Sequence, residues 1–459
     1  MRGIVLGLVA IWMAAAVGCA TSPSRATRVP PASAPPAAAG AAEVPPGSLP
    51  PAVADAAVDP QGTAPLAAAG VEAMESLTLE RALEIAERGH PAIAAAAARI
   101  EAAEGRALQA GLFPNPQAIA RFESAPFRGR TGDEADVVAG LSQRLPIGGR
   151  LSAAREVEDC DRRRLEHERD AVILGVRARV RKAFAAAQYG AAVVEVHDEG
   201  VRIAENGVRI ARARHQAGDA AADEAARAEA ELAREQIDLD RARRERELGL
   251  QELSVALGIP GAQIAFVAGD LSANAEADVD AGDFDASRHP ALVSALAGIA
   301  RERARIELAE KERVPDVTLD LLYRRLGDVE DPENGFDVGA AVAIPLFDRN
   351  QGAVKEARGG WAAAQQEARA AQVQVEGGLR ISLARLTQAR EAARRTRDEL
   401  LPRLADVLKA AEARYAAGDA PLVEVLPVRR DWVEAKIVYL EALREFGEAR
   451  AEVEGFRSR

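Results

Sequence analysis

Residues that could do chemistry are few in this chain, and their spacing fits no common catalytic or metal-binding site. The histidines lack the close spacing of zinc ligands; they are His90, His167, His197, His215 and His289. Aspartates between positions 270 and 285 lack the spacing and the terminal glutamate of a calcium loop. Neither a phosphate loop nor a nucleophile elbow occurs. The sequence therefore predicts no enzyme, no metal site and no cofactor. His90 and His289, each before a proline at a helix start, are predicted to cap or pack.

Cys19 is the one predicted site of modification. It follows an apolar stretch that is too short to span a bilayer comfortably and that begins after Arg2. The run Ala16-Val17-Gly18-Cys19 resembles a bacterial lipobox, in which the cysteine is acylated with palmitate and becomes the first mature residue, although the pattern prefers Leu to Ala16. Because Ala20 follows instead of Asp, the resemblance implies an outer membrane anchor. The alternative is a plain signal peptide with an incidental cysteine.

The chain contains the same unit twice, about two hundred residues apart. LPIGGR at 145–150 recurs as IPLFDR at 344–349, and RHQAGDA at 214–220 recurs as RYAAGDA at 414–420. The helix starts at His90-Pro91 and His289-Pro290 match as well. These landmarks occur in one order, which indicates a tandem duplication.

The elements of each half follow the same plan. A helix ends before a Pro-containing stop, and the apolar period then changes from 3.6 to 2 for a pair of strands of about ten residues, enough to cross a bilayer when tilted. Long helices follow over about 150–217 and 352–417, and shorter ones return over about 220–257 and 421–456. Gly200, the pairs at 359–360 and 377–378, and Pro402 are expected to bend or break them.

The fold class predicted is mostly α with a small β part. We divide the chain into a lipoprotein signal peptide (1–18), a Pro- and Ala-rich disordered tether (19–75), a first repeat (76–257), a connector (258–288) and a second repeat (289–459). The net charge of −12 and the pI near 5.2 argue against nucleic acid as a partner. Only 4% of the residues are aromatic, which is typical of long packed helices.

Four strands per chain cannot close a transmembrane barrel. An open sheet edge in hydrocarbon leaves backbone groups unpaired, at a cost of several kcal/mol each, so several copies must share one barrel. Three copies supply twelve strands, an even number within the known range. The long helices would then form a second tube beneath the barrel.

Residues 76–456 resemble an outer membrane factor of the TolC family. IPLFDRNQG at 344–352 is the most specific part and resembles the strand-to-helix junction of the heavy-metal efflux branch. The resemblance implies a trimer with a shared 12-stranded β-barrel in the outer membrane and a periplasmic α-helical barrel. It also implies partners, a periplasmic adaptor and an inner-membrane pump of the resistance-nodulation-division type.

The resemblance also implies a periplasmic gate near the hairpin tips. Glu224, Tyr415 and Glu424 match the family pattern by their distance from the hairpin glycine. Glu224 would accept a hydrogen bond from Tyr415, and Glu424 from three copies would form an acidic ring that attracts cations. Pro427 replaces a second acidic position. The adaptor would contact the tips at Gly218, Asp219, Gly418 and Asp419. Ordinary solvated carboxylates are the alternative for both glutamates.

Three functions remain open on the sequence. The first is a passive export duct for heavy-metal cations, opened by its partners and driven by the pump. The second is a general exporter of drugs or secreted polypeptides. The third is a structural coiled-coil lipoprotein, which predicts unbroken heptads and no alternating strands.

Overall fold

The computed structural model describes residues 76–123, 136–218, 222–272, 285–325 and 334–456. These all belong to one unit, residues 64–459. The predicted signal peptide and tether, Cys19 and Asp219 lie outside the described residues.

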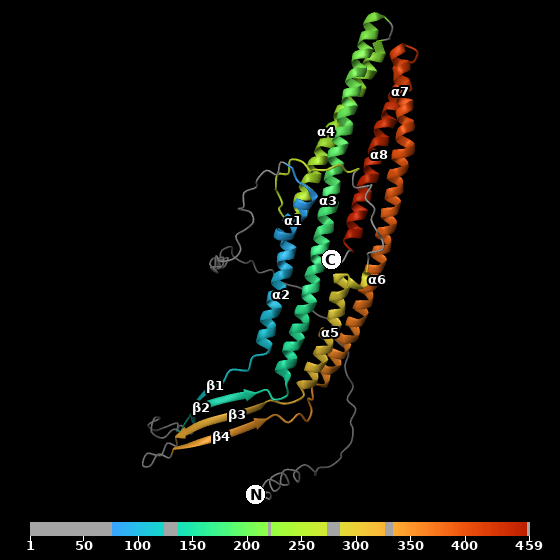
Figure 1. The fold of residues 1–459 in the computed structure, drawn as a ribbon. Helices are drawn as coiled ribbons and strands as arrows, with labels where there is room; N and C mark the ends of the chain where they lie inside the picture. Colours follow the sequence, from blue (N-terminus) through green and yellow to red (C-terminus); the bar gives the residue numbers. More distant parts are fainter. Residues whose placement is uncertain (1–75, 124–135, 219–221, 273–284, 326–333, 457–459) are drawn as a thin grey trace, which may run out of the picture. The chain divides into compact units, whose positions relative to one another are not determined.

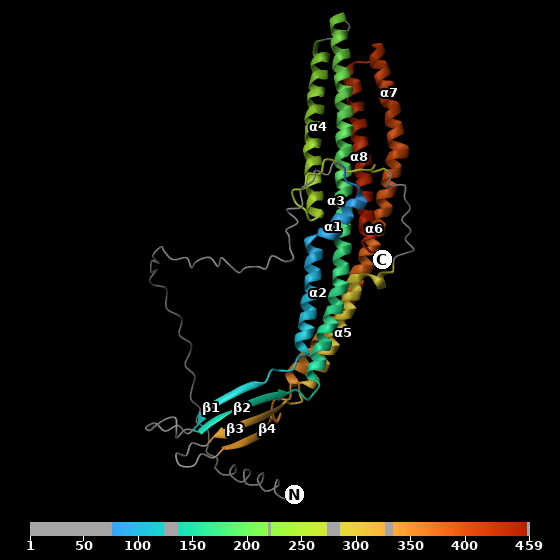
Figure 2. The same ribbon diagram turned by 60° about the vertical axis from the view of Figure 1, so that its left-hand side comes forward.

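The two halves repeat one order of elements: helix, two strands, long helix and returning helix. In the first half these are α1 (Leu79–Gly89), α2 (Pro91–Ala110), β1 (Gln117–Glu123), β2 (Asp136–Leu145), α3 (Arg150–Ala217) and α4 (Ala222–Ala256). In the second half they are the short 3-10 helix η4 (Ala286–Arg288), α5 (Pro290–Lys311), β3 (Val317–Arg325), β4 (Asn334–Val342), α6 (Gln351–Arg395), the π-helical turn η5 (Thr396–Leu400), α7 (Leu401–Ala417) and α8 (Leu422–Glu454). The strands lie at one end of the helices, and α3 and α7 end at the other (Figures 1 and 2).

Local sequence explains where the leading helices begin. Thr78 caps α1 by accepting a hydrogen bond from the Arg81 amide at 3.3 Å. The Nδ1 atom of His90 accepts from the Ala92 amide at 3.1 Å at the start of α2, and His289 accepts from the Ala291 amide at 3.3 Å at the start of α5. The prediction that both histidines cap or pack is confirmed.

The expected breaks at helical glycines are absent. Both α3 and α6 run through their glycines as continuous helices, and at 1.5 Å per residue α3 spans about 100 Å. Instead, several glycines admit a neighbouring side chain. A Cβ at Gly200 would lie 2.7 Å from a carboxylate oxygen of Glu235, and one at Gly378 would lie 2.9 Å from the Phe456 ring. These glycines therefore serve close packing, which a single sequence does not distinguish from a bend.

The break expected near Pro402 takes the form of a wider turn. The π-helical turn η5 lies directly before α7, and Pro402 occupies the first turn of α7. A proline there lacks an amide that could bond to the preceding turn, which accounts for the local change in winding.

The two predicted strand pairs join into one sheet. All four strands are antiparallel in the order β1-β2-β3-β4, and β2 pairs with β3 over Val137↔Arg325 to Leu145↔Val317. The strands contain 7, 10, 9 and 9 residues. Since β1 and β4 have no further neighbour in the described chain, both edges of this sheet are open.

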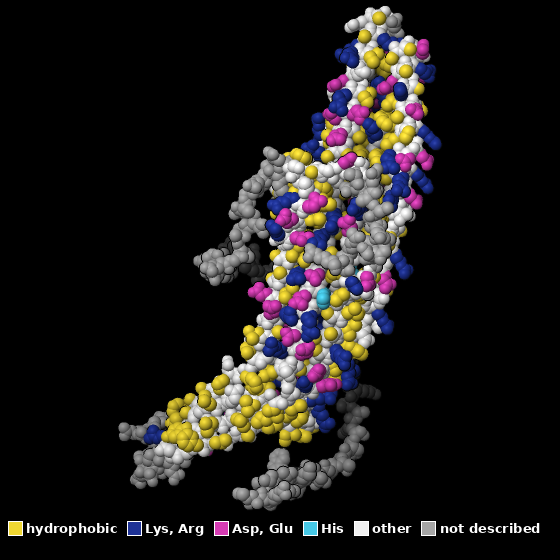
Figure 3. Space-filling model, viewed as in Figure 1, with side chains coloured by type: hydrophobic (Ala, Val, Ile, Leu, Met, Phe, Trp, Pro, Cys, Tyr) yellow, Lys and Arg dark blue, Asp and Glu magenta, His cyan; other side chains and the backbone are white. Residues whose placement is uncertain are grey.

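One face of the sheet is apolar, and the other carries most of the charged and polar side chains. Residues that pair directly lie on one face, and the register aligns Leu141 with Leu321, Leu321 with Val338 and Tyr323 with Phe336. Val338 and Phe336 are 81% and 75% exposed, and hydrophobic side chains gather over this end of the molecule (Figure 3). On the opposite face Arg324 pairs with Asp337 at 3.0 Å and with Glu123 at 3.4 Å. The predicted alternation is confirmed.

The helices pack around α3, which contacts α2, α4, α5 and α8. Part of the connector is packed as well. Leu77 forms an isolated parallel bridge with Val267, and both side chains are buried in a cluster with α1, α3 and α4. Ile264 and Leu257 belong to the same cluster. The first described residues are thus held against residues 257–267.

Candidate functional site

The site predicted from the sequence lies where the helical hairpins turn. Gly218 ends α3 and Gly418 ends α7, both in the left-handed region with φ of 84° and 83°, which a residue without Cβ adopts at little cost. Each glycine amide donates to the carbonyl three residues back, of His215 and Tyr415, at 3.1 Å. The Asp419 amide donates to the Arg414 carbonyl at 2.9 Å. Gly218 and Gly418 therefore end their helices with the same backbone conformation and the same hydrogen bond.

Tyr415 is buried where the two hairpins meet. Its side chain is 1% exposed and belongs to a cluster that draws on α3, α4, α7 and α8. The other buried members are Val208, Ala211, Ala228, Leu422 and Val425. A large aromatic ring in such a cluster contributes several kcal/mol relative to alanine, about 3–5 by analogy with other cores. The first hairpin is thereby attached to the second near their tips.

Arg214 contacts both of the predicted latch residues. Its Cζ lies 5.0 Å from the centroid of the Tyr415 ring, and its Nη1 lies 3.5 Å from Glu224 Oε1. The same Nη1 donates to the Tyr415 carbonyl oxygen at 3.5 Å. The Arg214 and Glu224 side chains are 20% and 15% exposed. Partial burial strengthens both the ion pair and the cation–π contact relative to water.

The Tyr415 hydroxyl differs from the expectation. It is buried and has no partner within hydrogen-bonding geometry in the described part of the chain. Burial raises the pKa of Tyr415, and the nearby Glu224 carboxylate raises it further. Glu224 is thus a neighbour of the phenol, but its ion pair goes to Arg214. The structure brings Glu224 and Tyr415 together through a residue that the sequence argument did not select.

Glu424 is placed differently. It forms an ion pair with Arg414 at 3.6 Å, and the two side chains are 54% and 60% exposed. Pro427 lies inside α8, one turn further on. Each tip therefore carries an arginine four residues before its glycine and a glutamate six residues after it. That identical spacing in the two repeats is the signal that could have found Arg214 and Arg414.

Further ion pairs connect the two hairpins below the tips. Arg430 of α8 donates two hydrogen bonds to Glu231 of α4, at 2.8 and 2.5 Å. Glu231 is 7% exposed, and the Arg430 hydrogen bond lowers its pKa. Lys436 of α8 reaches Glu199 of α3 at 2.5 Å. The second hairpin is thus held to both helices of the first.

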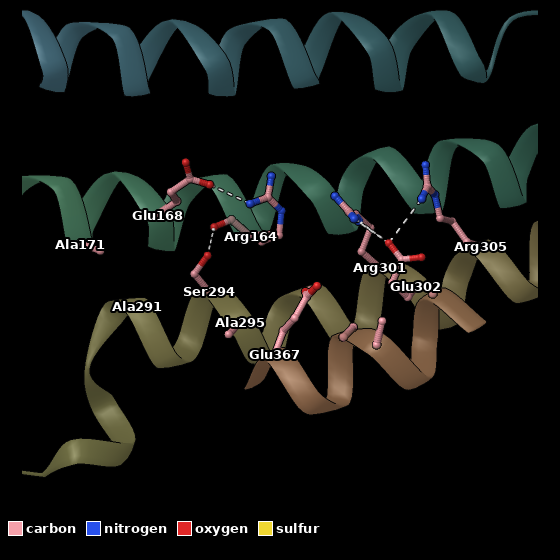
Figure 4. A pocket seen from close by; sticks show the side chains of 14 residues that line it. Arg164, Glu168, Ala171, Ala291, Ser294, Ala295, Arg301, Glu302, Arg305 and Glu367 are labelled. Atoms are coloured by element: carbon pink, nitrogen blue, oxygen red, sulfur yellow. Dashed lines mark hydrogen bonds and ion pairs between the residues drawn. The ribbon is translucent and has the colours of Figure 1, made fainter. Parts of the chain in front are cut away.

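A groove of about 620 Å³ lies near the strands, between α3, α5 and α6. Most of its charged side chains pair with one another (Figure 4): Arg301 and Arg305 converge on Glu302 at 2.6 and 3.4 Å, and Arg164 pairs with Glu168 at 2.7 Å. Such mutual pairing leaves little charge for a ligand. Among the described residues no three His, Cys, Asp or Glu side chains are grouped as metal ligands.

The hydropathy of the described helices bears on whether any of them could span a membrane. Within residues 76–456, apart from the undescribed gaps, no helix has the length and hydropathy needed to cross a bilayer.

The fold is that of solved outer membrane channels. The structure resembles the Campylobacter jejuni CmeC outer membrane channel with a TM-score of 0.69 at 16% identity, over 82% of this chain and 85% of that one. It resembles the Vibrio cholerae outer membrane protein VceC with a TM-score of 0.64 at 17% identity, over 82% and 94%.

The family follows from the sequence match. The model of the outer membrane efflux protein family matches residues 82–259 and 286–455, and the chain belongs to that family. It is also similar to the cobalt-zinc-cadmium resistance protein CzcC of Cupriavidus metallidurans, with 26% identity over 373 residues, 81% of this chain and 88% of CzcC.

Proposed function

We propose that three copies of this chain form an outer membrane channel through which heavy-metal cations leave the cell. The observation that carries the proposal is the four-stranded sheet with two open edges and one exposed apolar face. In hydrocarbon the apolar face is favourable, but the open edges are not. Joining β1 of one copy to β4 of the next removes every edge, and three copies give twelve strands.

In this proposal the helices continue the channel into the periplasm. Each chain supplies two long hairpins, and six hairpins would enclose a tube beneath the barrel. The tips would contact a periplasmic adaptor at Gly218, Asp219, Gly418 and Asp419, and the adaptor would connect the channel to an inner-membrane resistance-nodulation-division pump. Family membership supports these partners.

Similarity to CzcC supports metal cations as the substrate. The net charge of −12 is favourable for cations over anions. A general exporter of drugs or polypeptides has the same fold, so the substrate needs its own test.

The gate of the proposed channel is the tip contact. Arg214, Glu224 and Tyr415 hold the first hairpin against the second, and Glu424 faces solvent beside Arg414. Opening requires the hairpins to separate, which breaks these contacts.

The membrane anchor of the proposed channel would be a palmitoylated Cys19.

Two measurements test the proposal. Native mass spectrometry of the detergent-extracted protein should give three chains, and a single chain would overturn it. Deleting the gene should increase sensitivity to cobalt, zinc or cadmium, and the wild-type gene should restore resistance. Increased sensitivity to antibiotics alone would instead identify a drug exporter.

A further measurement tests the proposed palmitoylation of Cys19. Mass spectrometry of the mature amino terminus should detect the added lipid, with Cys19→Ala as the control.

A further inference from the structure

The same arginine–glutamate pair occurs at both tips but is covered at only one. Arg214–Glu224 and Arg414–Glu424 span 3.5 and 3.6 Å. Side-chain exposure is 20% and 15% for the first pair, and 60% and 54% for the second. Since the two pairs have the same spacing from the same glycine turn, their difference in burial has an external cause.

That cause is Tyr415. It belongs to the second hairpin, and its ring lies against Arg214 of the first hairpin. The contact therefore needs one hairpin beside the next. No side chain in the described chain covers Arg414 and Glu424 in this way, because the second hairpin has the first hairpin on one side only.

His215 is the repeat equivalent of Tyr415. Each residue lies three positions before its hairpin glycine and accepts a hydrogen bond from that glycine amide at 3.1 Å. The two side chains therefore project from equivalent helical positions on their hairpins. Tyr415 is buried, whereas His215 is exposed on the single chain.

We propose that His215 of each copy covers the Arg414–Glu424 pair of a neighbouring copy. This rests on the proposed trimer, in which first and second hairpins alternate around a ring. The relation that places the second hairpin beside the first then places the first hairpin of the next copy beside the second. The tip contact thus occurs six times, with tyrosine inside each chain and histidine between chains.

The chemistry of His215 suits this position. An imidazole N–H can donate to the Glu424 carboxylate, and the ring can stack on the planar guanidinium of Arg414. Burial under a neighbour would also strengthen the Arg414–Glu424 pair, as it does for Arg214 and Glu224. The acidic ring expected from Glu424 alone is therefore replaced by six paired and covered sites.

Site-specific crosslinking between differently tagged chains tests the contact. One chain carries His215→Cys and the other carries Glu424→Cys, both in a Cys160→Ser background, and the co-expressed proteins are treated with a short thiol-specific crosslinker. A product carrying both tags is expected, since the two cysteines lie on different copies. Each single variant crosslinked alone controls for residual Cys19.

The in-chain contact provides the matched control. Co-expressed Tyr415→Cys and Glu224→Cys chains should give little product with both tags, because those two residues meet within one chain. The double variant should crosslink inside a single chain. Equal dual-tag yields from the two pairings would overturn the proposal.

The same samples separate this inference from the proposed function. Trimers by native mass spectrometry without a His215–Glu424 product would overturn the inference and leave the channel intact. A single chain would overturn both. As a second readout, His215→Ala should raise single-channel conductance severalfold and His215→Tyr should return it toward wild type; unchanged conductance in both would contradict a role at the tip.

Discussion

Arg214 lies over the ring of Tyr415, with its Cζ 5.0 Å from the ring centroid, and this contact links residues that are 201 positions apart. One cation thus satisfies Glu224, the Tyr415 carbonyl and the aromatic face. Among the described residues, the Tyr415 hydroxyl has no partner in hydrogen-bonding geometry, although Glu224 lies close enough to raise its pKa. At the tips, the ring of Tyr415 and the guanidinium of Arg214 therefore form a direct contact between the two hairpins.

Substitutions at Tyr415 should therefore distinguish the contribution of the ring from that of the hydroxyl. Tyr415→Ala removes buried aromatic surface and the cation–π contact, and should cost about 3–5 kcal/mol of unfolding free energy and raise conductance. Tyr415→Phe retains both and should be close to neutral. Thermal unfolding and single-channel recording measure the two effects. If Phe raises conductance as much as Ala, the hydroxyl is the latch after all.

The Glu231–Arg430 pair should contribute more to the free energy of unfolding than an exposed ion pair of similar length. Arg430→Ala leaves a mostly buried carboxylate without its bidentate partner and should cost about 1–3 kcal/mol. Arg241→Ala removes a 3.0 Å pair whose side chains are 72% and 57% exposed, and should change stability by less than about 1 kcal/mol. Thermal unfolding of the detergent-extracted protein gives both values. Equal losses would show that burial is irrelevant here.

Adjacent glycines of α6 offer an internal comparison. A Cβ at Gly360 would lie 2.8 Å from Glu302 Oε2, whereas a Cβ at Gly359 meets nothing within 4 Å. Gly359→Ala should stabilise by up to about 1 kcal/mol through helix propensity, and Gly360→Ala should gain less, because the Glu302 carboxylate must shift away from the new Cβ. Equal or larger gains in melting temperature for Gly360→Ala would contradict this packing.

The capping histidine of α5 predicts a pH dependence of stability. Burial lowers the pKa of His289, although a hydrogen bond with the Gly455 backbone opposes this. Its neutral Nδ1 accepts from the Ala291 amide, so the folded state holds the proton less tightly than the unfolded chain. The stabilisation of the folded state by the His289 cap is complete above the unfolded-state pKa of about 6.5. It is lost as pH falls toward the lowered pKa of the folded state.

His289→Asn tests that dependence because asparagine also caps helices but does not titrate. Melting temperature measured from pH 8 to pH 5 should fall less steeply for the variant than for the wild type. His90→Asn is the companion variant, since burial and Arg179 lower the pKa of His90 at the matching position of the first repeat. Identical slopes for wild type and both variants would rule out a contribution from the caps.

Local patterns in the sequence were sufficient to predict much of this fold. The starts of α2 and α5, the alternating faces of β3 and β4 and the hairpin ends at Gly218 and Gly418 depend on neighbouring residues, whose chemistry is visible in order along the chain. Glu224 and Tyr415 were also brought together, though through an unforeseen arginine.

Features that depend on distant partners were missed for a physical reason. Gly200 admits Glu235 and does not bend α3, and nothing near Gly200 in sequence reveals that neighbour. Ile264 and Val267 lie in the connector, where the sequence shows little periodicity, yet both are buried against α1, α3 and α4. Burial there is decided by what the segment meets, and composition alone suggested a solvated connector.

The bridge between Leu77 and Val267 also sets an order for biogenesis. Leu77 N–H bonds to the Phe266 carbonyl at 3.1 Å, and the Ala268 amide bonds back to Leu77 at 2.8 Å. Leu77 therefore cannot reach its buried position until Val267, nearly two hundred residues later in the chain, has been synthesised. Until then, Leu77 lacks the segment against which it packs in the folded protein.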